Sequence, residues 1–223
     1  MKTSCYPCIH PEGLKGYTDL ISVSLKHTVK KGRSTMLLKK LNALLGELSI
    51  LFMLAHIGYN VFAYVTFYYN PFIKSITAYP CMILICLHAV CGMLIMFFTG
   101  DKGRGKLYIK QNIGTILQRI SAILILPLLI LHINTFNLMR ASAEQGLGIY
   151  IILLMLGEVL FFACVITHIS LSLTKGLVTL GILTSERLKK VLDVILYVVF
   201  FLVFAASCIV VIKGQAEMFL GGN

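Results

Sequence analysis

Three observations predict an all-α, multi-pass membrane protein with five transmembrane helices. The 223 residues are 58% hydrophobic and 13% charged. The chain contains five long apolar runs, each about as long as the roughly 20 residues that a helix needs to cross a bilayer. Basic residues gather in alternate connections between these runs. So little polar sequence remains that we expect no sizeable soluble domain.

The apolar runs are continuous rather than alternating, which favours helices over the strands of a membrane barrel. Around them we divide the chain into a basic cytoplasmic N-terminal segment (1–36), a five-span domain (37–213) and an external C-terminal tail (214–223). In order, the runs cover residues 41–66, 77–99, 113–137, 148–173 and 190–213.

The positive charge of the chain predicts its direction in the membrane. Of the 20 lysines and arginines, 17 fall in the N-terminal segment or near the second and fourth connections, leaving Lys74, Arg140 and Lys213 for the other side. Cytoplasmic loops collect Lys and Arg, so we expect the N-terminus inside and the C-terminus outside, which requires an odd number of spans. The net charge of +11 therefore follows from topology, and we expect no nucleic-acid partner.

Seven cysteines, most of them within apolar runs, argue against a disulfide framework. Cys5-Tyr-Pro-Cys8 fits half of a metal site, a redox pair or a tail with two reduced thiols. It is not a c-type haem signature, because Ile9 follows Cys8 where that signature has histidine.

Four histidines are the most informative polar residues, because an ionisable group inside a membrane is costly and indicates function. They are His56, His88, His132 and His168, one on each of the first four spans. The 1.5 Å rise per residue places His56 and His132 in the outer half of the membrane. It places His88 and His168 nearer the cytoplasm.

Two histidine pairs at two depths, each drawn from two helices, are what two stacked bis-histidine haems require. The alternative is that the histidines only form hydrogen bonds between helices. Gly46 and Gly92 would leave room for a ring. Arg119, near the cytoplasmic boundary, and Lys175 could pair with propionates of the inner haem; alternatively, these two cations extend toward lipid headgroups.

At these residues the sequence resembles the single-polypeptide, two-haem cytochrome b that anchors succinate dehydrogenases and fumarate reductases in the membrane. The resemblance covers about residues 37–213. It is carried by LLKKLNALLGELSILFMLAH at 37–56, LHAVCG at 87–92, QRISAILILPLLILH at 118–132 and THISLSLTKGLVTLGILTSERLKK at 167–190.

The resemblance implies an outer b-type haem between His56 and His132, an inner one between His88 and His168, and Asn42 as a cofactor-binding residue. It also implies two partners on the cytoplasmic face, a flavoprotein with covalent FAD and an iron–sulfur subunit. The chain would pass electrons to or from a membrane quinone, with menaquinone expected. It would do no dicarboxylate chemistry itself, and it would lie in the cytoplasmic membrane of a prokaryote.

Two of the chain's departures from the family bear on the site. Ala43 follows Asn42 where the family commonly has serine, and no acid lies between Glu47 and Asp101, where some members have a glutamate that accepts quinol protons. Glu158, about 15 Å further out than His168, is therefore the predicted catalytic proton acceptor. Glu47, predicted near the inner haem, is as well explained as a protonated acid hydrogen-bonded between helices.

Two other functions remain open. The chain could be a membrane anchor of the same fold without haem. It could instead be a proton-coupled transporter that uses Glu47 and Glu158 as a relay.

Overall fold

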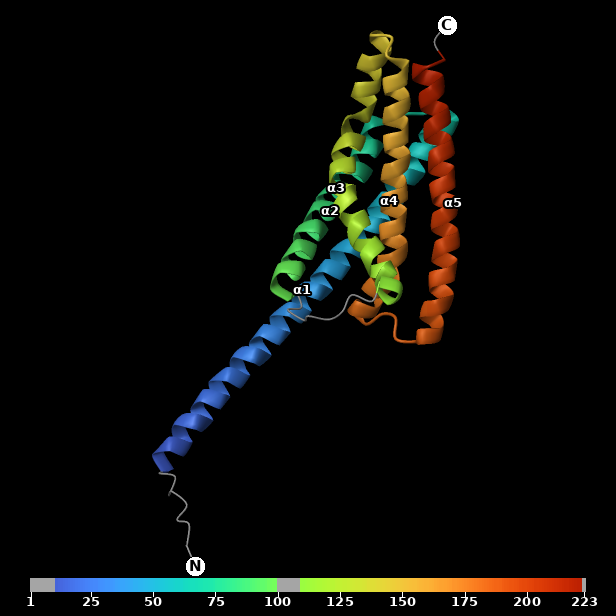
Figure 1. Ribbon diagram of the computed structural model, residues 1–223. Helices are drawn as coiled ribbons and strands as arrows, with labels where there is room; N and C mark the ends of the chain where they lie inside the picture. Colours follow the sequence, from blue (N-terminus) through green and yellow to red (C-terminus); the bar gives the residue numbers. More distant parts are fainter. Residues whose placement is uncertain (1–10, 100–108, 222–223) are drawn as a thin grey trace, which may run out of the picture.

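The computed structural model describes residues 11–99 and 109–221, and these residues form five long α-helices (Figure 1). Cys5 and Cys8 lie outside the described residues. The helices are α1 (Pro11–Thr66), α2 (Pro71–Thr99), α3 (Ile109–Glu144), α4 (Gly148–Leu180) and α5 (Glu186–Phe219).

All five helices are long and apolar enough to cross a membrane, which confirms the predicted number and type of spans. The helices are longer than the apolar runs. Residues 11–36 of the predicted N-terminal segment belong to α1, and α5 continues through 214–219 of the predicted tail. An established helix gains one hydrogen bond per added residue, so polar flanking residues extend it at little cost.

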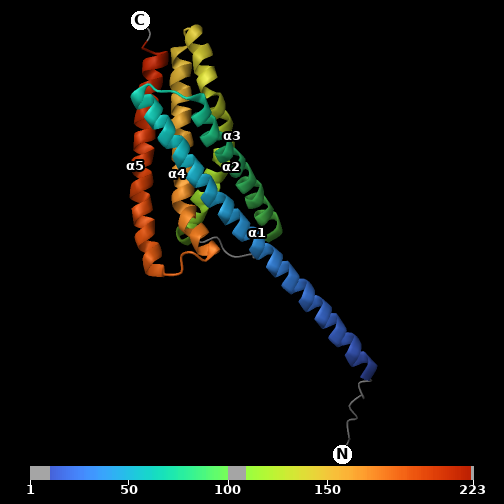
Figure 2. The same ribbon diagram turned by 180° about the vertical axis from the view of Figure 1, so that it is seen from behind.

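Two hairpins and a fifth helix make up the bundle (Figures 1 and 2). α1 packs along α2, α3 packs along α4, and α4 also packs against α1 and α5. The N-terminal part of α1 extends well beyond the bundle as a continuous helix. Among the described residues, α2 packs its backbone closely against α1 alone, so the two hairpins meet mainly through α1 and α4.

Most of the buried apolar residues form two small clusters that lie along α4. Ile50, Ile169 and Phe200 join α1, α4 and α5. Met139, Ile151, Leu154 and Met155 join α3 to α4 beside the C-terminal end of α5. Burial of these side chains fixes α4 as the common neighbour of α1, α3 and α5.

Most large apolar side chains face outward instead. Phe97 is 81% exposed, Ile149 is 78% exposed, and similar residues follow every span. A protein surrounded by water rarely presents so continuous an apolar surface. The exposure agrees with a multi-pass membrane protein whose helices are covered by lipid.

Several hydroxyl side chains within the spans form hydrogen bonds within their own helix. Thr135, Ser142 and Ser207 each donate a hydrogen bond to the carbonyl oxygen four residues earlier in the same helix, at 2.7–2.9 Å. Such bonds compensate hydroxyl groups in a medium without water. These buried hydroxyls therefore need no ligand as a hydrogen-bond partner.

Candidate functional site

The structure places each of the four span histidines on a different helix, α1 to α4, and all four are half-buried. Each predicted pair joins helices whose backbones do not pack closely on one another within the described residues: α2 with α4 for His88 and His168, and α1 with α3 for His56 and His132. Side chains, or a group held between them, must therefore span the distance in both pairs.

The imidazoles of His88 and His168 lie together, with ring centroids 6.2 Å apart and ring planes at 72°. Two imidazoles on opposite faces of one metal ion stand about 6 Å apart between centroids, because each metal–nitrogen bond is about 2 Å and each centroid lies about 1 Å beyond its nitrogen. The observed spacing fits one bis-histidine ligand pair.

Both rings of this inner pair are held by the same kind of contact. His88 Nδ1 lies 2.9 Å from the carbonyl oxygen of Asn42, and His168 Nδ1 lies 3.0 Å from that of Gln118. Carbonyl oxygens only accept, so each Nδ1 carries the proton and donates it. The other nitrogen, Nε2, is then left with a lone pair, as in histidines that ligate metals.

Gly46 makes the position of His88 possible. A Cβ added at residue 46 would lie 3.0 Å from His88 Cε1 and 3.1 Å from Nδ1. The bare backbone of α1 therefore lets the ring approach the carbonyl of Asn42. Gly92, the other glycine singled out from the sequence, faces Asn42 Oδ1, and a Cβ there would make an ordinary contact at 3.7 Å.

Gln118 connects the inner pair to a cation. Its carbonyl accepts from His168, and its side-chain Oε1 accepts from Lys175 Nζ at 2.7 Å. Lys175 is thus linked to the His168 contact through Gln118, although its side chain is exposed. Arg119 is also exposed, and it makes no hydrogen bond or ion pair with the described residues.

Asn42 contributes to the site mainly through its backbone. Its carbonyl anchors His88, while its side-chain Oδ1 is buried and has no hydrogen-bond partner in the part of the chain that the structure describes. A buried acceptor without a donor costs free energy, on the order of 1–3 kcal/mol. An additional donor beside the inner histidines would remove that cost.

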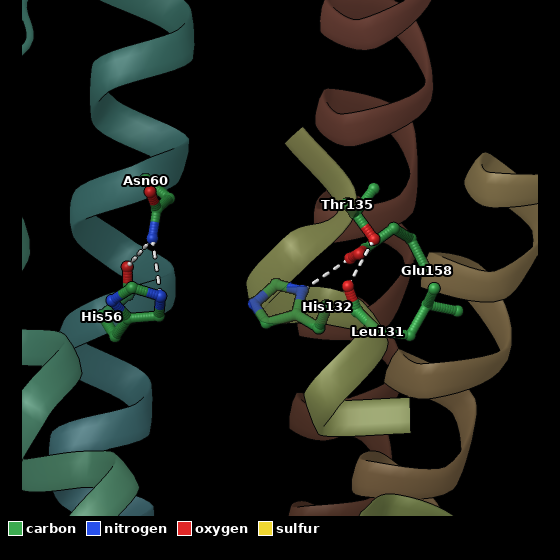
Figure 3. A network of polar contacts seen from close by, with 6 residues as sticks. All are labelled: His56, Asn60, Leu131, His132, Thr135 and Glu158. Carbon is green, nitrogen blue, oxygen red and sulfur yellow. Dashed lines mark hydrogen bonds and ion pairs between the residues drawn. The ribbon is translucent and has the colours of Figure 1, made fainter. Parts of the chain in front are cut away.

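In the predicted outer pair, His132 contacts an acid rather than a carbonyl. His132 Nδ1 lies 2.6 Å from Glu158 Oε2 on α4, and the ring stacks on Phe161 with centroids 4.8 Å apart (Figure 3). Glu158 is 2% exposed. The predicted proton acceptor is therefore a buried partner of a predicted ligand; its role in accepting quinol protons stays a prediction.

His56 is held by weaker and different contacts. Asn60 Nδ2 lies 3.1 Å from His56 Nε2 and also donates to the His56 carbonyl at 2.7 Å, while Thr77 Oγ1 lies 3.4 Å from Nδ1. Figure 3 shows the His132 imidazole projecting from α3 toward α1, where His56 lies. No ring contact joins these two histidines among the described side chains. Ligation through His56 Nε2 would require Asn60 to give up one hydrogen bond.

The two levels are separated by the same distance in both hairpins. Gly46, which contacts His88, lies ten residues before His56 on α1, and Glu158, which contacts His132, lies ten residues before His168 on α4. Ten residues of helix are about 15 Å long. The chain therefore presents two histidine levels about 15 Å apart.

Glu47, predicted near the inner pair, makes its contact with α4. Its carboxyl group packs against Gly176 of α4, where an added Cβ would collide with Oε1. Among the described residues, no group of three or more His, Cys, Asp and Glu side chains is arranged to hold a metal ion. An axial pair on haem needs only two protein ligands, so the histidine pairs are of a different kind from such a cage.

Sequence reasoning missed three contacts. Gln118 is the first residue of the quoted segment 118–132, but the sequence does not indicate which backbone carbonyl a histidine will contact. The Asn60–His56 contact has a helical signal in its spacing of four residues. Glu158 was placed at the depth of His132 by residue rise, yet contact between α3 and α4 depends on how both helices are turned.

Comparisons with protein-family models, with curated proteins and with solved structures found no match to this chain.

Proposed function

We propose that the chain is the dihaem cytochrome b membrane anchor of a succinate:quinone oxidoreductase, either a succinate dehydrogenase or a fumarate reductase. The observation that carries the proposal is the inner pair: two imidazoles 6.2 Å apart, each with Nδ1 committed to a backbone carbonyl. A pair that served only to join helices would have no need to leave both Nε2 atoms without a donor among the described residues.

The residues at the inner level fit a b-type haem as they stand. His88 and His168 would be the axial ligands, with Gly46 providing space beside the first ring. Lys175 would supply positive charge for the propionates, and Asn42 Oδ1 would gain a donor if a propionic acid or an ordered water met it. When bound, the haem supplies one-electron redox chemistry in a site shielded from water.

The outer level fits in part without rearrangement. His132 presents Nε2 because Nδ1 is engaged with Glu158, and Phe161 holds the ring from one side. His56 would complete the pair once Asn60 turns its amide from Nε2 and keeps its bond to the His56 carbonyl. This change would be a rotation of the Asn60 side chain.

The surrounding assembly follows from the resemblance and the charge distribution. The N-terminus would be cytoplasmic and the C-terminus external, in the cytoplasmic membrane of a prokaryote. A flavoprotein and an iron–sulfur subunit would dock at the inner end, near the level of Lys175. Quinone, with menaquinone expected, would exchange electrons with the chain.

A proton-coupled transporter is less well supported. Glu158 and Gly176, against which Glu47 packs, are 18 residues apart on α4, so the two acids lie about 27 Å apart along the bundle. No hydrogen bonds between described side chains connect them. A relay would need a continuous path of polar groups, and the segment between them includes the apolar residues Phe161, Cys164 and Ile169.

The absorption spectrum of the purified chain tests the proposal. We expect low-spin b-type bands on reduction and two haems per polypeptide. A chain that stays colourless after expression with adequate haem would overturn it and leave the haem-free anchor or the transporter. Proton flux in proteoliposomes separates those two, since only the transporter would carry protons without a redox partner.

A further inference from the structure

Glu158 makes a short side-chain contact with His132, a predicted ligand. The Nδ1–Oε2 distance to His132 is 2.6 Å, with the His132 side chain 31% and the Glu158 side chain 3% exposed. The other anchored span histidines, His88 and His168, meet neutral carbonyl groups. One ligand position therefore has a buried carboxyl group behind it and its counterparts at the inner level do not.

Two aromatic rings pack around the His132 imidazole, and Glu158 makes its side-chain hydrogen bond with His132. Phe161 stacks on the imidazole at 22°, and Phe162 meets its edge with centroids 6.1 Å apart. Thr135 donates its hydroxyl to the carbonyl of Leu131 at 2.9 Å, so this bond stays within α3 (Figure 3). Glu158 Oε1 is buried without a hydrogen-bond partner among the described residues.

The direction of the hydrogen bond follows once Nε2 of His132 is a ligand. A ligating Nε2 has no proton, so Nδ1 carries the proton and donates it to Oε2. A carboxyl group in this position fixes the ring orientation and makes the imidazole a stronger electron donor. In a buried site, where charges are weakly screened, a stronger donor stabilises the oxidised iron more than the reduced iron.

We propose that Glu158 is a positioning residue that acts through His132: it orients the outer ligand and lowers the reduction potential of the outer haem. This inference rests on the proposed function. It assigns Glu158 a role that differs from direct acceptance of quinol protons, because the carboxyl oxygen nearest the site is already engaged with the ligand.

The test compares full-length purified variants by haem content and by redox titration of the two haems. Glu158→Gln keeps the size of the side chain and removes the carboxylate; Glu158→Asp keeps the carboxyl group. Glu217→Gln is the matched control, because Glu217 is a mostly exposed acid whose contact is Lys213 at 3.9 Å. A His88→Ala background, which is expected to hold only the outer haem, assigns the potentials.

We expect Glu158→Gln to retain two haems, to raise the potential of the outer haem and to leave the inner one unchanged. The outer-haem potential of Glu158→Asp should be closer to that of the parent chain. Both potentials of Glu217→Gln should equal those of the parent. If Glu158→Gln loses the outer haem, retention of that haem by Glu158→Asp supports the inference. Loss in both variants overturns it, because a packing role would then suffice.

Two further outcomes separate the possible failures. Two haems with unchanged potentials in Glu158→Gln overturn the inference and leave the proposed function standing; if quinol turnover is lost in that same variant, Glu158 is instead the proton acceptor. A parent chain without haem overturns the proposed function itself.

Discussion

The imidazole of His88 lies against the bare backbone of Gly46, where a Cβ would come within 3.0 Å of the ring. Nδ1 of this ring lies 2.9 Å from the carbonyl oxygen of Asn42, one turn earlier on α1. The orientation of one predicted ligand is thus set by the absence of a side chain on the neighbouring helix.

Gly46→Ala should therefore remove the inner haem or reduce its occupancy severalfold. The added methyl group crowds the His88 ring, which has to shift from its place between Asn42 and His168. Haem content and the reduced spectrum measure the effect. Gly58→Ala is the control on the same helix, since a Cβ there meets nothing within 4 Å. Because Ala forms helices better than Gly by about 1 kcal/mol, the control should be neutral or slightly stabilising. Equal haem content in both variants would contradict the assignment.

His88→Ala and His168→Ala should each remove the same single haem. The two rings form one pair, so the double variant should lose no more than either single one. His132→Ala should remove the other haem. Pyridine haemochrome analysis gives the count per chain, and His27→Ala, outside the spans, should leave two. If His88→Ala and His132→Ala removed the same haem, the division into two levels would be wrong.

Lys175→Gln should lower the reduction potential of the inner haem. A nearby cation disfavours the more positive oxidised iron, so its removal stabilises that state. Because Lys175 is exposed, solvent screening limits the shift. Potentiometric titration measures it, with Lys213→Gln at the other end of the bundle as the matched loss of charge. An unchanged inner potential would show that Lys175 interacts with Gln118 alone.

Gly214→Ala should destabilise the contact between α1 and α5. The added Cβ would lie 2.6 Å from two ring atoms of Tyr64, and a ring cannot yield as a flexible chain end can. Overpacking of this kind costs about 1–3 kcal/mol. Thermal unfolding in detergent measures the loss. In a Tyr64→Ala background the same substitution should cost almost nothing, so the two changes should be strongly non-additive; simple additivity would place the cause elsewhere.

The five helices could be predicted because continuous apolar runs of span length have few alternative structures in a bilayer. Their ends could not, since α5 passes through residues 214–219 where the apolar pattern has already stopped. The levels of the four histidines followed from the rise per residue. The contact of His88 with His168 depends on the rotation and crossing of α2 and α4, which depth does not specify. Predicting the contact between Glu158 and His132 would likewise have required the rotation and crossing of α3 and α4.

The pairing of helices also bears on how the molecule assembles. α2 packs on α1, and α3 on α4, whereas each histidine pair takes one residue from each hairpin. A cofactor held by such a pair would cross-link the two hairpins, and its binding free energy would add to the stability of the folded chain. Cofactor supply would then decide how long the finished protein survives in the cell, independently of any electron that it carries.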